Sequence, residues 1–166
     1  MLVASVYQNQ LSGTIPPELE LGMLTAAALL AFQGNNFEGA IPSELGALTN
    51  LYDLSFANNN HTGPIPSQLG MLTSLGNLDV GNNSLTGPIP PTLASLHQSL
   101  YYFDVHGNAL LSGTVPEALC TLNGTCIPIP FQLTCPEGTP HVAFDCTGLL
   151  WGCNCSSGNT SNGAKP

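Results

Sequence analysis

Residues 75–90 read LGNLDVGNNSLTGPIP, and this stretch decides the fold. Leu78 and Val80 lie two positions apart, which is the period of a short β-strand with one buried face. Asn83 follows them, and its short amide side chain can satisfy backbone groups that a turn would otherwise bury without partners. The glycine of TGPIP tolerates a tight turn, and its prolines remove backbone donors where neither a helix nor a central strand is expected. The stretch therefore predicts one coil of a solenoid, with a strand on its inner side, then a turn, then a segment on its outer side.

The same pattern recurs along the chain. TGPIP also occurs at residues 62–66, and Ile-Pro or Val-Pro pairs recur at intervals of 26, 24, 24 and 26 residues. Each pair follows an asparagine, so that the template reads LxxLxLxxNxLxGxIPxxLxxL. Five copies predict stacked coils that share one apolar interior, pinned by a ladder of inward amides. The pairs begin at Ile15, Ile41, Ile65, Ile89 and Val115, and the ladder consists of Asn9, Asn35, Asn59, Asn83 and Asn108.

This template resembles the leucine-rich repeats of the plant-specific type, and residues 1–119 match it. The resemblance implies an α/β solenoid, a right-handed superhelix with a short-stranded parallel sheet on its concave face. Similar repeats occur in the ectodomains of plant receptor-like proteins and receptor kinases and in polygalacturonase-inhibitor-like proteins. These proteins bind peptides, proteins or glycans outside the cell. By resemblance, the chain is expected to be an extracellular or cell-surface recognition module, and not an enzyme.

Three parts are expected along the chain. Residues 1–119 hold the five repeats, residues 120–156 form a cysteine-rich C-terminal cap, and residues 157–166 form a flexible tail. The first repeat is truncated, because Met1 falls inside a repeat, and it lacks an N-terminal cap. No secretory signal is present at the start. We therefore expect the sequence to be a fragment of a larger secreted or receptor-like protein, or the product of a late-starting gene model.

All six cysteines lie in the predicted cap, which favours disulfides and an oxidising compartment. They permit many connectivities, of which we favour Cys120 with Cys126 and Cys135 with Cys146. A zinc site is the alternative, but the paired C-x-x-C spacing is missing, so no metal is expected. Five N-x-S/T sequons agree with secretion and predict glycosylation. The cysteines are Cys120, Cys126, Cys135, Cys146, Cys153 and Cys155, and the sequon asparagines are Asn60, Asn82, Asn123, Asn154 and Asn159.

Composition and charge narrow the classes of partner. The sequence has ten carboxylates against one Lys or Arg and a formal net charge of −9, so nucleic acid and anionic membranes are excluded as partners. The longest apolar run, residues 26–32, is too short to cross a bilayer. No cofactor motif is present. A protein or peptide ligand, or a glycan, is the expected partner.

The predicted concave face carries a patch of polar residues from the third, fourth and fifth repeats. Aligned strands place Asp79 beside Asp104, so that one carboxyl group has a raised pKa or a cation lies between them. Carboxylates with an aromatic ring and an imidazole suit a basic or hydroxyl-rich partner, with Tyr102 as the aromatic anchor. An open sheet with no nucleophile motif disfavours catalysis, and ordinary solvated surface is the alternative. The patch consists of Asp53, Asn77, Asp79, Tyr102, Asp104 and His106.

A second function remains open, namely binding of a repetitive surface such as ice or a polysaccharide. Similar repeats occur in a plant antifreeze protein, and the chain is rich in Thr, Asn and Ser. A regular threonine array would favour this function, but Glu38 or Ala40 interrupts it in the second copy. A purely structural role ranks third. His61 stands where other copies have Leu or Phe, and we expect it to be a partly exposed substitution without a switching role.

Overall fold

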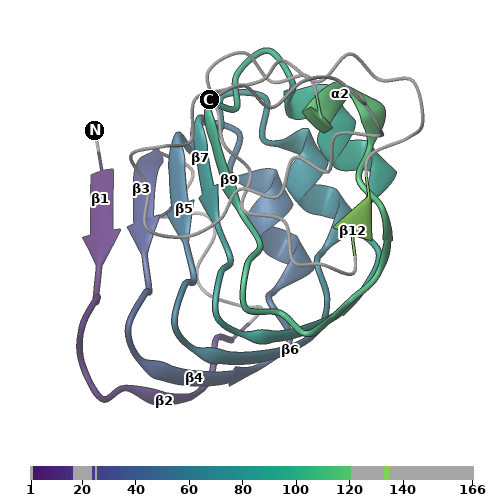
Figure 1. Ribbon diagram of the computed structural model, residues 1–166. Helices are drawn as coiled ribbons and strands as arrows, with labels where there is room; N and C mark the ends of the chain where they lie inside the picture. The colour runs from purple at the N-terminus through teal and green to yellow at the C-terminus, as the bar shows by residue number, and fades with distance from the viewer. Residues whose placement is uncertain (1, 17–23, 25, 121–132, 135–166) are drawn as a thin grey trace, which may run out of the picture.

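The computed structural model describes residues 2–16, 24, 26–120 and 133–134, and it shows stacked repeats built around two parallel sheets (Figure 1). The main sheet has the strand order β1-β3-β5-β7-β9, with every pair parallel. It is the sheet that the sequence predicts for the concave face. Its strands are β1 (Leu2–Ser5), β3 (Ala27–Ala31), β5 (Asp53–Ser55), β7 (Asn77–Asp79) and β9 (Tyr102–Asp104).

A second sheet, here called the lateral sheet, follows the asparagine turns in the order β10-β8-β6-β4-β2. These strands were not predicted from the sequence, because the prolines of TGPIP argued against a central strand. The structure places Pro64 at the last position of β6, where the strand ends. The repeat glycine lies in the left-handed region, as with φ 77° at both Gly63 and Gly87. The strands are β2 (Ser12–Thr14), β4 (Asn36–Gly39), β6 (Asn60–Pro64), β8 (Ser84–Gly87) and β10 (Leu110–Leu111).

Short 3-10 helices close three of the repeats. Each begins directly after the proline of its Ile-Pro pair, since proline presets φ and has no backbone donor to satisfy. The apolar residues that follow point into the interior. The helices are η1 (Ser43–Ala47), η2 (Ser67–Met71) and η3 (Pro91–Leu96), and beyond them lie α2 (Glu117–Cys120) and the parallel pair β11 (Gly113–Thr114) and β12 (Leu133–Thr134).

One apolar core runs through the stack from Ile15 to Leu119. The three repeats that have a 3-10 helix each contribute a leucine of the main-sheet strand and at least one of the helix, and Phe56 and Phe103 are fully buried among them. Phe32 stacks on Phe56 with ring centroids 5.2 Å apart, which joins two successive repeats. Burial of this kind, about 25 cal/mol per Å² of apolar surface, is the main favourable contribution to folding.

Asn83 shows how the asparagines link the repeats. Its amide nitrogen donates to the carbonyl oxygens of Phe56, Val80 and Gly81 at 3.0, 3.2 and 3.1 Å. Its amide oxygen accepts the His61 backbone N–H at 2.9 Å. One amide thus binds backbone groups in two successive repeats.

The neighbouring ladder residues repeat this arrangement. Asn35, Asn59 and Asn108 are buried and donate to carbonyls of their own and the preceding turn. Asn9 differs, since it is exposed and donates to Val6 and Tyr7 within its own turn. Its side chain therefore contributes less to the stack than the four buried ones.

His61 corrects an expectation, because its side chain is fully buried instead of partly exposed. The imidazole packs edge-on against Phe56 at 5.3 Å and occupies the interior position that Leu85 fills in the next repeat. Nδ1–H donates to the Gly39 carbonyl at 3.2 Å, while the buried Nε2 has no hydrogen-bond partner. Burial lowers the pKa of His61 below its ordinary 6.5. The fold therefore holds this histidine in its neutral form.

Replacing this histidine with an apolar side chain is expected to stabilise the protein. His61→Leu removes an unsatisfied buried nitrogen, which is worth about 1 kcal/mol at neutral pH. The folded-state pKa lies below the unfolded value of 6.5, so wild type loses stability as the pH falls below 6.5, and the variant lacks this loss. Thermal unfolding of both proteins from about pH 8 to 5 should show a widening gap in Tm. The exposed His97→Gln should leave the pH dependence unchanged, and a constant gap for His61→Leu would contradict this account.

The predicted cap and tail fall largely outside the described residues. Cys120 ends α2, but the other five cysteines, the sequons at Asn123, Asn154 and Asn159, and residues 157–166 are not among them. The disulfides therefore stay predictions. Within the described part of the chain, no helix is both long enough and apolar enough to cross a membrane.

Candidate functional site

The register of the main sheet brings the predicted patch together from three strands. Asp53 on β5 pairs with Asn77 on β7, and Asn77 pairs with Tyr102 on β9. Two residues further along the same strands, Asp79 pairs with Asp104. His106 lies two residues after the end of β9, and its carbonyl accepts the N–H of Asn82 in the adjacent turn. The six predicted residues therefore form one continuous surface.

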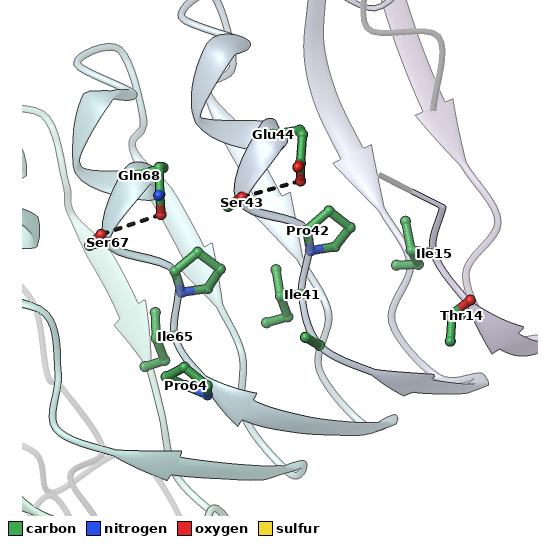
Figure 2. Close-up of a pocket in the computed structure, with 12 residues that line it drawn as sticks. Thr14, Ile15, Ile41, Pro42, Ser43, Glu44, Pro64, Ile65, Ser67 and Gln68 are labelled. Atoms are coloured by element: carbon green, nitrogen blue, oxygen red, sulfur yellow. Dashed lines mark hydrogen bonds between the residues drawn. The ribbon is translucent and has the colours of Figure 1, made fainter. Parts of the chain in front are cut away.

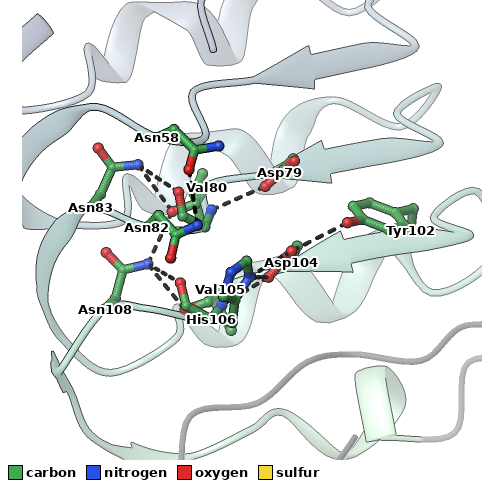
Figure 3. A network of polar contacts seen from close by, with 11 residues as sticks. Asn58, Asp79, Val80, Asn82, Asn83, Tyr102, Asp104, Val105, His106 and Asn108 are labelled. Carbon is green, nitrogen blue, oxygen red and sulfur yellow. Dashed lines mark hydrogen bonds and ion pairs between the residues drawn. The ribbon is translucent and has the colours of Figure 1, made fainter. Parts of the chain in front are cut away.

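Asp104 and His106 form the most ordered contact of the patch (Figure 3). His106 Nδ1–H donates to both carboxylate oxygens of Asp104 at 2.6 and 2.8 Å, and the His106 backbone N–H adds a bond of 2.8 Å. The Tyr102 hydroxyl donates to the other side of the same carboxylate at 3.2 Å. Asp104 is only 5% exposed, so it holds the ring and the hydroxyl in place instead of meeting a ligand directly.

Gly81 creates the space that the His106 ring occupies. A Cβ at this position would lie 2.9 Å from His106 Nδ1 and 3.2 Å from the Asp104 carboxylate. A larger residue would therefore displace the imidazole from the sheet. The His106 ring thus lies over Gly81. The His106 side chain is 39% exposed, so a partner can reach it.

Asp79 supplies a carboxyl group that titrates near neutrality. Burial raises its pKa to about 6, the Gly81 N–H at 3.0 Å opposes that shift, and the nearby Asp104 carboxylate adds to it. The prediction of one raised carboxyl pKa in this pair is in accord with this geometry. The charge of the patch therefore changes between about pH 5 and 7.

The remaining members of the patch are held by neighbours on the adjacent strand. Asn77 Nδ2 donates to Asp53 Oδ1 at 2.9 Å. Burial raises the pKa of Asp53, and this hydrogen bond partly offsets the shift. Burial also raises the pKa of Tyr102, with the Asp104 carboxylate as the next cause, so that the phenol stays protonated. Tyr102 is 37% exposed and therefore accessible to a ligand.

Two aromatic residues that were not predicted from the sequence lie beside this patch. Tyr52 and Tyr101 precede β5 and β9 and lie with ring centroids 5.8 Å apart, on either side of Gly76. A signal was present in the sequence, since Tyr52, Gly76 and Tyr101 each follow the first leucine of their repeat. Strand register then brings alternate repeats close enough for the rings to meet across the glycine.

A separate hollow lies on the other side of the molecule, where the lateral sheet meets η1 and η2 (Figure 2). It has a volume of about 680 Å³ and is lined by the isoleucines and prolines of three repeats, with Glu44 and Gln68 at its edge. Its polar lining residues are largely occupied with each other, as with Ser43 and Glu44 at 3.2 Å. The groove follows from the Ile-Pro repeat, and Glu44 is the one charged residue among those that line it.

Two predicted glycosylation asparagines lie in the described region and are exposed. Asn60 begins β6 on the lateral sheet, whereas Asn82 lies in the turn beside the patch with φ 53°. Asn82 Nδ2 donates to Asn58 Oδ1 at 3.0 Å, along the row of turns. A glycan on Asn82 would stand at the edge of the patch, so glycosylation there stays a prediction that bears on ligand size. Among the described residues, no group of three His, Cys, Asp or Glu side chains is placed to hold a metal ion.

Comparisons with known proteins agree with this architecture. A family model described as Leucine Rich Repeat matches residues 74–96. The leucine-rich repeat ectodomain of the Arabidopsis thaliana membrane receptor kinase GASSHO1/SCHENGEN3, solved in complex with CASPARIAN STRIP INTEGRITY FACTOR 2, is 40% identical over 70% of this chain and 13% of that chain, with a TM-score of 0.63. The plant peptide hormone receptor RGFR1 in complex with RGF2 is 31% identical over 81% of this chain and 20% of that chain, with a TM-score of 0.69.

A solved structure of another kind is also similar. A plant ice-binding protein is 31% identical over 74% of this chain and 40% of that chain, with a TM-score of 0.65. A search of curated proteins found no match. The chain spans 13%, 20% and 40% of the lengths of these three solved chains. The repeat template, the parallel sheets and the similar solved structures lead to the same conclusion. The chain belongs to the leucine-rich repeat family and is similar to the ectodomains of plant receptor kinases.

Proposed function

We propose that the chain is an extracellular recognition module that binds a protein or peptide ligand on its main sheet. The observation that carries this proposal is the held cluster of Tyr102, Asp104 and His106, in which a buried carboxylate orients two exposed side chains. Ordinary solvated surface does not need such an arrangement, whereas a binding site gains affinity when its contact groups are already in place.

The similar receptors support the same role. RGFR1 is described as a peptide hormone receptor, and GASSHO1/SCHENGEN3 is a membrane receptor kinase whose ectodomain was solved with its partner. The GASSHO1/SCHENGEN3 ectodomain is described as a leucine-rich repeat ectodomain, and the exposed sheet of a solenoid is a common binding surface. The role is binding and not catalysis, because the sequence has no nucleophile motif or phosphate loop.

A peptide selection tests this proposal. The immobilised full chain would be panned against displayed random dodecapeptides, and the affinity of the selected peptides measured against wild type and against Tyr102→Ala and His106→Ala. Loss of an interface anchor costs about 2 kcal/mol, so we expect binding to weaken about 30-fold. Glu44→Ala, an exposed residue on η1 away from the patch, is the matched control and should change affinity less than about twofold.

Either of two results would overturn the proposal. One is a selection that yields no binder to the wild-type chain. The other is a set of binders whose affinity is the same for wild type, Tyr102→Ala and His106→Ala, because those peptides would contact another face.

The lateral sheet supports a second candidate, binding to ice or a polysaccharide surface. Thr62 and Thr86 are on adjacent strands of this sheet, and a plant ice-binding protein has a similar fold. The array is irregular, because the strand register pairs Thr14 with the exposed carboxylate Glu38. A thermal-hysteresis assay decides the point, and Glu38→Thr should increase any hysteresis if this sheet is the ice-binding face.

A further inference from the structure

Tyr52 and Tyr101 form an exposed aromatic pair at the end of the main sheet where β5 and β9 begin. Their side chains are 52% and 48% exposed, and the rings are tilted by 40°. The backbone between them is fixed, since the Gly76 N–H donates to the Tyr52 carbonyl and the Gly76 carbonyl accepts the Tyr101 N–H, both at 2.9 Å. The pair is therefore a preformed platform instead of two independent side chains.

Gly76 is what allows the rings to meet. A Cβ at Gly76 would lie 2.9 Å from the Tyr52 ring and 2.5 Å from the Tyr101 ring, so any side chain would push the rings apart. A glycine here removes the cross-strand neighbour that would otherwise cover the backbone. Two large half-exposed rings over a bare backbone stabilise the fold less than buried ones would, which points to a contact role.

The surroundings of the pair determine which ligand it suits. Asp53 directly follows Tyr52. The pKa of Tyr101 is raised first by its hydrogen bond to Tyr52, then by burial and the charge of Tyr52, and last by the nearby Asp53 carboxylate. The described residues include no Lys or Arg, since the single one in the sequence is Lys165. No positive charge in the described part of the chain therefore competes for these ring faces or for the Asp53 carboxylate.

We propose that the Tyr52–Tyr101 pair, together with Asp53, binds an arginine side chain of a basic peptide ligand. The planar guanidinium stacks on a tyrosine face and donates N–H groups to the carboxylate, which an ammonium or a neutral group does less well. The inference rests on the proposed function and extends its site by two residues that lie beside Asp53. It names the ligand class as an arginine-bearing peptide.

The test uses a small probe that does not depend on any selected peptide. N-acetylarginine methylamide would be titrated into the isotope-labelled full chain, and the Gly76 amide signal, which lies between the rings, would be followed by NMR. We expect a saturable shift of this signal. The isosteric but uncharged N-acetylcitrulline methylamide is the matched ligand control and should produce no saturable shift.

Variants assign the binding to the pair. Tyr52→Leu with Tyr101→Leu should weaken binding of the arginine probe about tenfold, since each exposed ring contributes a few-fold. Asp53→Asn should weaken it about threefold. Both tyrosines are exposed, so these variants should fold, and Tyr7→Leu, an exposed tyrosine in the first repeat, is the control that should leave binding unchanged.

The outcomes separate this inference from the proposed function. Equal shifts with the arginine and citrulline probes, or no shift of the Gly76 signal, would overturn the arginine proposal. A saturable shift with cellotetraose instead of the arginine probe would also overturn it, because that result would assign the rings to a glycan. Selected peptides that require Tyr102 would still support the proposed function in each of these cases. Failure of the selection with a positive arginine titration would leave this contact in place and remove the wider peptide site.

Discussion

Asn83→Ala is expected to destabilise the protein by about 4 kcal/mol. The substitution removes two N–H donors that three carbonyl oxygens share, together worth about 2 kcal/mol. It also leaves the buried His61 N–H without the acceptor that it now uses, which costs about 2 kcal/mol more. A loss of this size approaches the whole folding free energy of a marginally stable domain. Equilibrium urea unfolding, followed by circular dichroism, measures the difference.

Asn9→Ala is the matched control, because it removes the same side chain from a turn where it is exposed. Its amide bonds two carbonyls of its own turn, so the expected loss is below about 1 kcal/mol. Equal losses for the two variants would show that the asparagines act through local turn geometry and not through links between repeats.

Gly70→Ala is expected to cost about 3 kcal/mol, the upper end of the range for overpacked interiors. A Cβ at Gly70 would collide with the backbone carbonyl of Thr92 on η3, and a Cβ at Gly46 would meet Gln68 on η2 in the same way. Backbone atoms cannot rotate aside as a flexible side chain can. The strain would therefore spread to the packing between successive 3-10 helices, and the midpoint of urea unfolding should fall.

The chain contains a natural control for this position. Ala94 occupies the equivalent site in η3, so a methyl group is accommodated there against the neighbouring unit. Ala94→Gly should cost less than about 1 kcal/mol, mainly through backbone entropy. A loss of stability for Gly70→Ala as small as that for Ala94→Gly would contradict this explanation. It would show that the distance between stacked repeats can adjust and is not set by the glycines.

The template was enough to predict the main sheet and its register. Leucines at a spacing of two identify the buried face, and one asparagine per copy places the columns, so Asp79 beside Asp104 follows from alignment alone. The lateral sheet was not predicted, because proline argues against a strand. In the structure the strand precedes the proline and ends at it, as β6 ends at Pro64. His61 was expected to be partly exposed, because its residue type suggested the surface, while the repeat position puts it in the core.

The sequence by itself determined the repeat, the strands of the main sheet and the location of the acidic patch, because these depend on periodic positions that every copy shares. Only the tertiary structure decided that Asp104 is buried beneath His106 and that Tyr52 and Tyr101 meet over Gly76. The tyrosine contact joins residues from alternate repeats, and both contacts depend on the absence of a side chain at a glycine of the adjacent repeat, Gly81 for His106 and Gly76 for the two tyrosines. The repeat pattern can be seen in the sequence alone, whereas these side-chain contacts form only when the repeats stack.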